Sequence, residues 1–224
     1  MTYYTTRNNL ETIIIFLYSL IPLTYITGPF LPDLILCIIC VLFIIYSVRK
    51  KFLKDIIVSR FIYITLFINL YFIFTSINSS NILLSLESTI FYFRFFLFSL
   101  AIAILILSHK RMIIDLMFII LTFSFIILII SIAYELIFYK SIFGLCNGYV
   151  YSGKPLDRVS GLFCKDLIIG NYFARLSPIY AYLLYAKFSN SKNVYNLITY
   201  FLLVSLIIVF ISGERAAFIL SLIN

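Results

Sequence analysis

Residues 114–138 read IDLMFIILTFSFIILIISIAYELIF, and the only charged residues among them are Asp115 and Glu135. Crossing a hydrocarbon layer about 30 Å thick takes roughly 20 residues of α-helix at 1.5 Å per residue. Lipid admits only helices or closed barrels, because every backbone polar group must be paired internally. The apolar run is continuous, whereas the strands of a membrane barrel alternate polar and apolar residues. The segment therefore predicts a transmembrane helix.

The composition extends this prediction to the whole chain of 224 residues, of which 63% are hydrophobic and only 12% are charged. A soluble domain is about 45–50% apolar and about 25% charged, so a soluble globular protein is excluded. Disorder is excluded as well, because disordered chains are poor in large apolar residues and rich in charge. We therefore expect an all-α, polytopic transmembrane helical bundle whose first partner is the lipid bilayer.

Seven complete apolar segments and a shorter eighth are separated by polar or glycine-containing stretches. They run approximately over residues 12–28, 33–48, 56–76, 90–108, 114–138, 167–186, 196–212 and 215–224. The eighth segment is long enough to cross only about half of a bilayer. We therefore expect residues 1–224 to form a single transmembrane domain that is the N-terminal part of a longer protein.

The basic residues predict the orientation of these segments. The net charge is +8, and Lys and Arg gather at residues 49–54, 110–111 and 187–192, with Arg7 near the N-terminus. The positive-inside rule places these clusters, and with them the N-terminus, in the cytoplasm. The same rule explains the positive charge without nucleic acid as a partner. The outer loops are then expected at residues 28–32, 76–89 and 139–166.

Four arginines lie in the predicted outer half of the membrane, against this trend: Arg94, Arg158, Arg175 and Arg215. Each alone could be an interfacial anchor. Together they predict an anion site, because the planar guanidinium donates two parallel hydrogen bonds to phosphate and keeps its charge. Residues 158–178 and 211–220 also place glycine turns directly before helices, whose first N–H groups favour anions.

Acidic residues accompany these arginines. Asp157 and Glu214 stand beside Arg158 and Arg215, where they can compensate charge locally. Alternatively, one carboxylate among Asp157, Asp166, Glu214 and Glu87 binds sugar hydroxyls or orients an arginine. The role of Glu135 stays open.

On the predicted cytoplasmic side, Asp115 is expected to pair with Lys110 or Arg111, and His109 is expected to be an ordinary loop residue.

Neither a metal nor another cofactor is expected, because no helix carries His or carboxylate pairs at the spacing of metal ligands. Cys37 and Cys40 form a C-x-x-C pattern within an apolar segment, which favours two small buried residues over a redox site. Cys146 and Cys164 share the predicted outer loop. There they can be free or form a disulfide in an oxidising compartment.

Two segments carry a family resemblance: RVSGLFCKDLIIGNYFARLSP at residues 158–178 and ISGERAAFIL at residues 211–220. They resemble the O-antigen ligase and polymerase family of polytopic membrane glycosyltransferases, over roughly residues 60–224. The second segment matches the family's S-G-x-R-(A/G)-A turn. The residues that carry the resemblance are Arg158, Ser160, Gly161, Phe163, Gly170, Pro178, Ser212, Gly213 and Arg215, supported by Arg94.

The resemblance implies a metal-independent glycosyltransferase of the bacterial inner membrane, acting at the periplasmic face. Its donor would be a glycan linked to undecaprenyl diphosphate. A ligase moves that glycan to lipid A-core, and a polymerase moves it to another lipid-linked glycan. Family members are about twice as long and carry a functional histidine in a large periplasmic loop, so residues 1–224 alone are expected to be inactive.

For the site, we expect Arg215 and Arg158 to be catalytic, because preorganised cations stabilise the charge that grows on the leaving diphosphate. Arg94, Arg175, Asp166 and Glu214 are expected to bind substrate. The alternative from another class is a flippase that transports lipid-linked glycans. A flippase would need cations at several depths along a central cavity.

Overall fold

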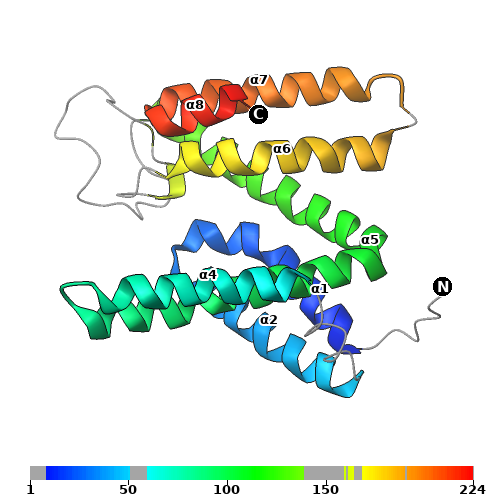
Figure 1. Cartoon of the computed structure of the whole chain (residues 1–224). Helices are drawn as coiled ribbons and strands as arrows, with labels where there is room; N and C mark the ends of the chain where they lie inside the picture. Colours follow the sequence, from blue (N-terminus) through cyan, green and yellow to red (C-terminus); the bar gives the residue numbers. More distant parts are fainter. Residues whose placement is uncertain are drawn as a thin grey trace. The chain divides into compact units, whose positions relative to one another are not determined.

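The computed structural model describes residues 9–50, 60–138, 159, 161–163, 168–189 and 191–223. Its elements, in chain order, are α1 (Asn9–Thr24), the 3-10 helix η1 (Tyr25–Thr27), α2 (Phe30–Arg49), α4 (Arg60–Ile77), α5 (Ile82–Phe138), the 3-10 helix η3 (Gly161–Phe163), α6 (Ile169–Phe188), α7 (Val194–Ser212) and α8 (Arg215–Ile223) (Figure 1). Within these residues there is no strand. The prediction of an all-α protein is confirmed.

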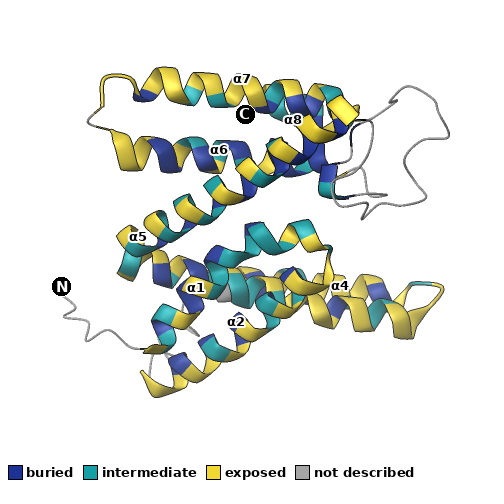
Figure 2. Cartoon of the chain, turned by 180° about the vertical axis from the view of Figure 1, so that it is seen from behind, coloured by how far each residue is buried: buried dark blue, intermediate teal, exposed yellow. Residues whose placement is uncertain are grey.

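Four of the described helical segments are long and apolar enough to cross a membrane: Asn9–Thr27, Phe30–Arg49, Ile82–Phe138 and Val194–Ser212. Figure 2 shows extensive exposed surface along the helices, and much of it is apolar. Phe67 is 73% exposed and Leu107 is 87% exposed, for example. Apolar surface on this scale suits a lipid environment and not water. The count of seven spans and the cytoplasmic N-terminus stay predictions.

The label α5 covers two successive helices, and its 57 residues are more than one membrane span needs. The backbone leaves the helical region at His109, where φ is −133° and ψ is 35°. The apolar segments 90–108 and 114–138 lie on either side of this break. His109 therefore lies where two helices join, between the predicted segments 90–108 and 114–138.

One predicted loop is shorter than expected. An outer loop was predicted at residues 76–89. The structure has only a short turn there, because α4 ends at Ile77 and α5 begins at Ile82. The Ser76 hydroxyl lies 2.6 Å from the Thr89 hydroxyl, and both side chains are buried. This contact ties the two helices together just beyond the turn.

The chain divides into two compact units. The first comprises Met1–Ile21 and Pro29–Lys110, and the second comprises Pro22–Gly28 and Arg111–Asn224. In the second unit, α6 packs against both α7 and α8 (Figure 1). The segments on which the family resemblance rests both lie in this second unit.

An aromatic cluster forms much of the core of the second unit. The ring of Phe125 lies 5.1–6.0 Å, between centroids, from the rings of Tyr172, Phe173, Tyr180 and Phe201. Aromatic pairs at such distances stabilise a core beyond the area that they bury. The cluster thus fixes the face of α6 that is turned toward α5 and α7.

Helix α1 also contributes to the second unit. The buried Tyr172 hydroxyl donates a hydrogen bond to the Pro22 carbonyl, at 2.9 Å. Pro22 lies in the last turn of α1, where carbonyl groups have no partner within the helix. The tyrosine therefore satisfies a carbonyl that the helix itself leaves open.

Candidate functional site

Glu214 joins the two segments that carry the family resemblance. It lies between α7 and α8, and its carboxylate accepts the N–H of Gly170 at 2.7 Å and that of Asn171 at 3.0 Å. Both N–H groups belong to the first turn of α6, where backbone donors have no partner within the helix and the helix dipole favours negative charge. The turn after α7 and the start of α6 therefore form one site.

Gly170 permits this close approach because it has no side chain. A Cβ atom at this position would meet the Ser212 hydroxyl, and it would lie 3.0 Å from the carboxyl carbon of Glu214. The first contact would displace the Ser212 side chain, and the second would press on the carboxylate that caps α6. The glycine therefore leaves room for the close packing of these two side chains.

The turn itself depends on Gly213. This residue ends α7 in the left-handed conformation, with φ +69°, and donates its N–H to the Phe210 carbonyl at 3.1 Å. Glycine adopts this conformation without steric cost. The Ser-Gly sequence thus stops α7 abruptly and lets α8 begin at Arg215.

Arg215 and Arg175 are both exposed, on α8 and α6. Within the described part of the chain, neither forms a salt bridge. They stand on the two helices that Glu214 connects. Two other predicted site residues, Arg158 and Asp166, lie outside the described residues.

Glu135 binds the first residue of the 3-10 helix η3, Gly161. Its carboxylate is buried, with 1% of the residue exposed, and accepts the N–H of Gly161 at 2.6 Å. Gly161 has φ +59°, and a Cβ atom there would lie 2.7 Å from the Cδ1 atom of Ile169. The role that the sequence left open for Glu135 is therefore at least in part structural, since it satisfies a buried backbone donor.

Arg94 lies in the first unit and has an acidic partner. Its guanidinium forms a salt bridge with Asp33 at 2.8 Å and lies 3.6 Å from the sulfur of Cys37. The rings of Phe91 and Phe95 stand within 5.8 Å and 5.1 Å of it. Sequence reasoning missed Asp33, although it is the one acidic residue in the first turn of α2.

The cysteines of α2 partly follow the prediction. Cys40 is buried, Cys37 is half-buried, and both are free. The Cys40 thiol donates to the Arg94 carbonyl at 3.2 Å, which is a packing contact between α2 and α5. Cys146 and Cys164 lie outside the described residues.

Asp115 pairs with Lys187 of α6, at 3.4 Å, and not with the neighbouring Lys110 or Arg111. The Lys187 ammonium also lies 4.5 Å from the centroid of the Phe118 ring. The prediction of a local pair is therefore wrong, because packing in the second unit offers Asp115 a cation from another helix.

No protein-family model, no curated protein and no solved structure matches this chain. Among the described residues, no group of three or more His, Cys, Asp or Glu is arranged to hold a metal ion. Any assignment of function therefore rests on composition, on the two short motifs and on the geometry around Glu214.

Proposed function

We propose that the protein is a membrane glycosyltransferase of the O-antigen ligase and polymerase type. It would act at the periplasmic face of the bacterial inner membrane on a glycan linked to undecaprenyl diphosphate. The observation that carries the proposal is the capping of α6 by Glu214. Two segments chosen for their resemblance to one family meet through Glu214 of the second and through Gly170 and Asn171 of the first, of which Gly170 is one of the residues that carry the resemblance.

The proposed chemistry is electrostatic. An acceptor hydroxyl attacks the anomeric carbon, the bond from that carbon to phosphate breaks, and negative charge grows on the leaving diphosphate. Arg215 and Arg158 would stabilise this charge, and Arg175 would hold the diphosphate from α6. Asp166 would contact the substrate from the loop before α6. Arg94 contributes less in this scheme, because Asp33 already balances its charge.

The acceptor hydroxyl must also lose its proton to a general base. Glu214 is poorly suited to that task, because its two oxygens already accept backbone N–H groups. We therefore assign Glu214 to holding the turn before Arg215, in place of direct contact with sugar hydroxyls.

A transfer assay tests the proposal. The protein, expressed from its complete gene, is placed in sealed vesicles with a fluorescent glycan on undecaprenyl diphosphate and with lipid A-core. Label on lipid A-core indicates a ligase, and a ladder of longer lipid-linked glycans indicates a polymerase. Passage of the donor across the membrane without transfer indicates a flippase and contradicts the proposal, as does the absence of any transfer.

The proposed topology makes a separate prediction. Residues 49–54, 109–111 and 187–192 should face the cytoplasm, and residues 139–166 the periplasm. In a background with the four native cysteines replaced by serine, Gly153→Cys should react with a membrane-impermeant maleimide in intact cells, and Lys50→Cys should not. Labelling at position 50 with protection at position 153 would reverse the assignment.

A further inference from the structure

A buried carboxylate near the end of α5 binds the backbone of η3. Glu135 is 1% exposed, and its Oε2 atom accepts the N–H of Gly161 at 2.6 Å. A buried carboxylate is costly unless it is hydrogen-bonded, so this contact is not easily given up. Glu135, η3 and α6 all belong to the second compact unit. Glu135 therefore fixes the backbone of η3 within the unit that contains the candidate site.

The residues on either side of Gly161 are held as well. Val159 and Phe163 are both buried, and the Phe163 ring lies 5.9 Å, between centroids, from the ring of Tyr172 on α6. Gly161 itself packs against Ile169, the first residue of α6. The described residues of the segment 159–163 are thus tied to α5 by a hydrogen bond and to α6 by apolar packing.

We propose that Glu135 is a positioning residue for Arg158. In the sequence, Arg158 directly precedes the buried Val159 and stands three residues before Gly161. Glu135 would act through the backbone of Gly161, without touching the substrate. This role rests on the proposed function, in which Arg158 stabilises the leaving diphosphate. Such a cation must be placed accurately, because a misplacement of about 1 Å can cost about a hundredfold in rate.

The first test measures kcat/KM for the donor in the vesicle assay, with the protein expressed from its complete gene. Glu135→Met keeps the length of the side chain but removes the acceptor, so kcat/KM should fall about 10- to 100-fold. Glu135→Gln keeps an oxygen that can accept the Gly161 N–H, so most of the rate should return. An unchanged kcat/KM in Glu135→Met overturns the positioning role, as does a loss in Glu135→Gln equal to that in Glu135→Met.

The decisive test repeats the measurement in an Arg158→Ala background. If Glu135 acts through Arg158, Glu135→Met should cause little further loss there, because the two substitutions are then coupled. If Glu135 only supports folding, Glu135→Met should lower kcat/KM by the same factor in both backgrounds, and the positioning role is wrong. Should Glu135→Met fail to accumulate, Gly161→Ala replaces it, since the added methyl group presses on Ile169 and disturbs the same segment.

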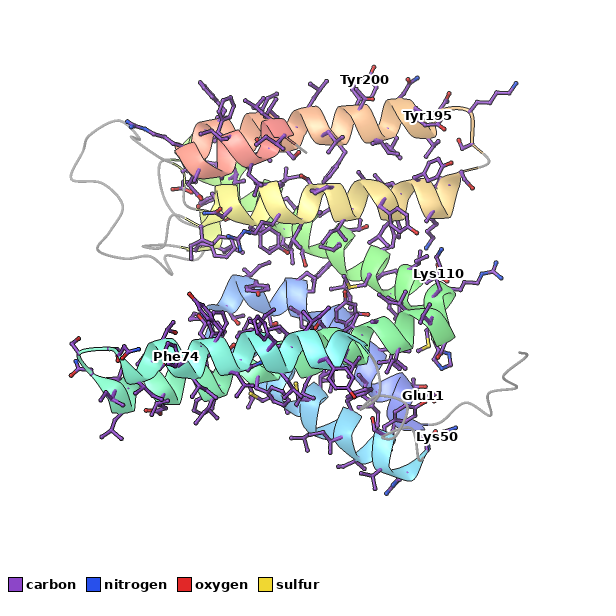
Figure 3. The ribbon with its side chains drawn as sticks, viewed as in Figure 1. Glu11, Lys50, Phe74, Lys110, Tyr195 and Tyr200 are labelled. Carbon is purple, nitrogen blue, oxygen red and sulfur yellow. The ribbon has the colours of Figure 1, made fainter. Side chains whose placement is uncertain are left out.

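Ser131→Ala is the matched control. Ser131 stands one helical turn before Glu135 and is equally buried, but its hydroxyl has no hydrogen-bond partner in the described part of the chain. Tyr200→Ala is a second control, because Tyr200 is 69% exposed on α7, toward the end of that helix away from the Ser-Gly turn (Figure 3). Both variants should keep a kcat/KM close to that of the wild type.

The outcomes separate this role from the proposed function. A wild-type protein that transfers no glycan contradicts the proposed function, and the positioning role falls with it. A wild-type protein that transfers glycan, with an equal loss from Glu135→Met in both backgrounds, contradicts the positioning role alone. A loss in Ser131→Ala as large as that in Glu135→Met also overturns the role, since any change on this face of α5 would then have the same effect.

Discussion

Replacing Arg215 by alanine is expected to slow glycan transfer about a hundred- to thousandfold, which corresponds to roughly 2.7–4 kcal/mol of lost transition-state stabilisation. The reason is the position of this arginine. Arg215 begins α8 directly after the turn that Glu214 fixes. Its side chain is exposed and forms no salt bridge with another described residue. The measurement is the initial rate of label transfer in the vesicle assay.

Arg215→Lys should recover only part of the rate, because an ammonium keeps the charge but loses the two-pronged contact with phosphate oxygens. Arg111→Ala is the matched control: it removes an exposed arginine of the same unit that lies on the predicted cytoplasmic side. Its rate should stay near that of the wild type. If Arg215→Ala accumulates normally and transfers glycan as fast as Arg111→Ala, Arg215 does not act on the diphosphate.

Gly170→Ala is expected to lower the free energy of unfolding by about 1–3 kcal/mol, the usual cost of overpacking a filled site. The new methyl group would displace the Ser212 side chain and press on the Glu214 carboxylate that caps α6. Reversible unfolding in mixed micelles, followed by the loss of helical signal, measures the change.

A double-mutant cycle with Ser212→Ala shows whether the contact is direct. Removing the Ser212 hydroxyl should restore part of the stability of Gly170→Ala, with a coupling energy of about 0.5–3 kcal/mol. Recovery should be incomplete, because the Glu214 carboxyl carbon still stands 3.0 Å from the added methyl group. Strict additivity of the two substitutions would show that the close approach described here does not exist.

The helices themselves were accessible from sequence. The segment predicted at 33–48 becomes α2 at Phe30–Arg49, and the segment predicted at 196–212 becomes α7 at Val194–Ser212. Apolar runs this long make helices because backbone groups in lipid must be paired within the segment. Whether such a segment forms a helix therefore depends on its own composition and can be predicted from it.

The partners of the polar side chains could not be predicted from sequence, because they depend on how the helices pack. Asp115 stands four residues from Arg111, a favourable helical spacing, yet it pairs with Lys187. Glu214 adjoins Arg215 but caps α6. Nothing in the sequence around Glu214 indicated that its carboxylate would accept backbone N–H groups more than 40 residues away.

During synthesis, the Pro22 carbonyl leaves the ribosome 150 residues before the tyrosine that binds it. At about 5–20 residues per second, this interval lasts about 8–30 s. All residues of the first compact unit have been made before this interval ends, since that unit ends at Lys110. The nascent chain can therefore close its first unit while residues 22–28 still await α6, and a pause in translation before residue 172 would prolong an intermediate in which the end of α1 has not reached its native contact.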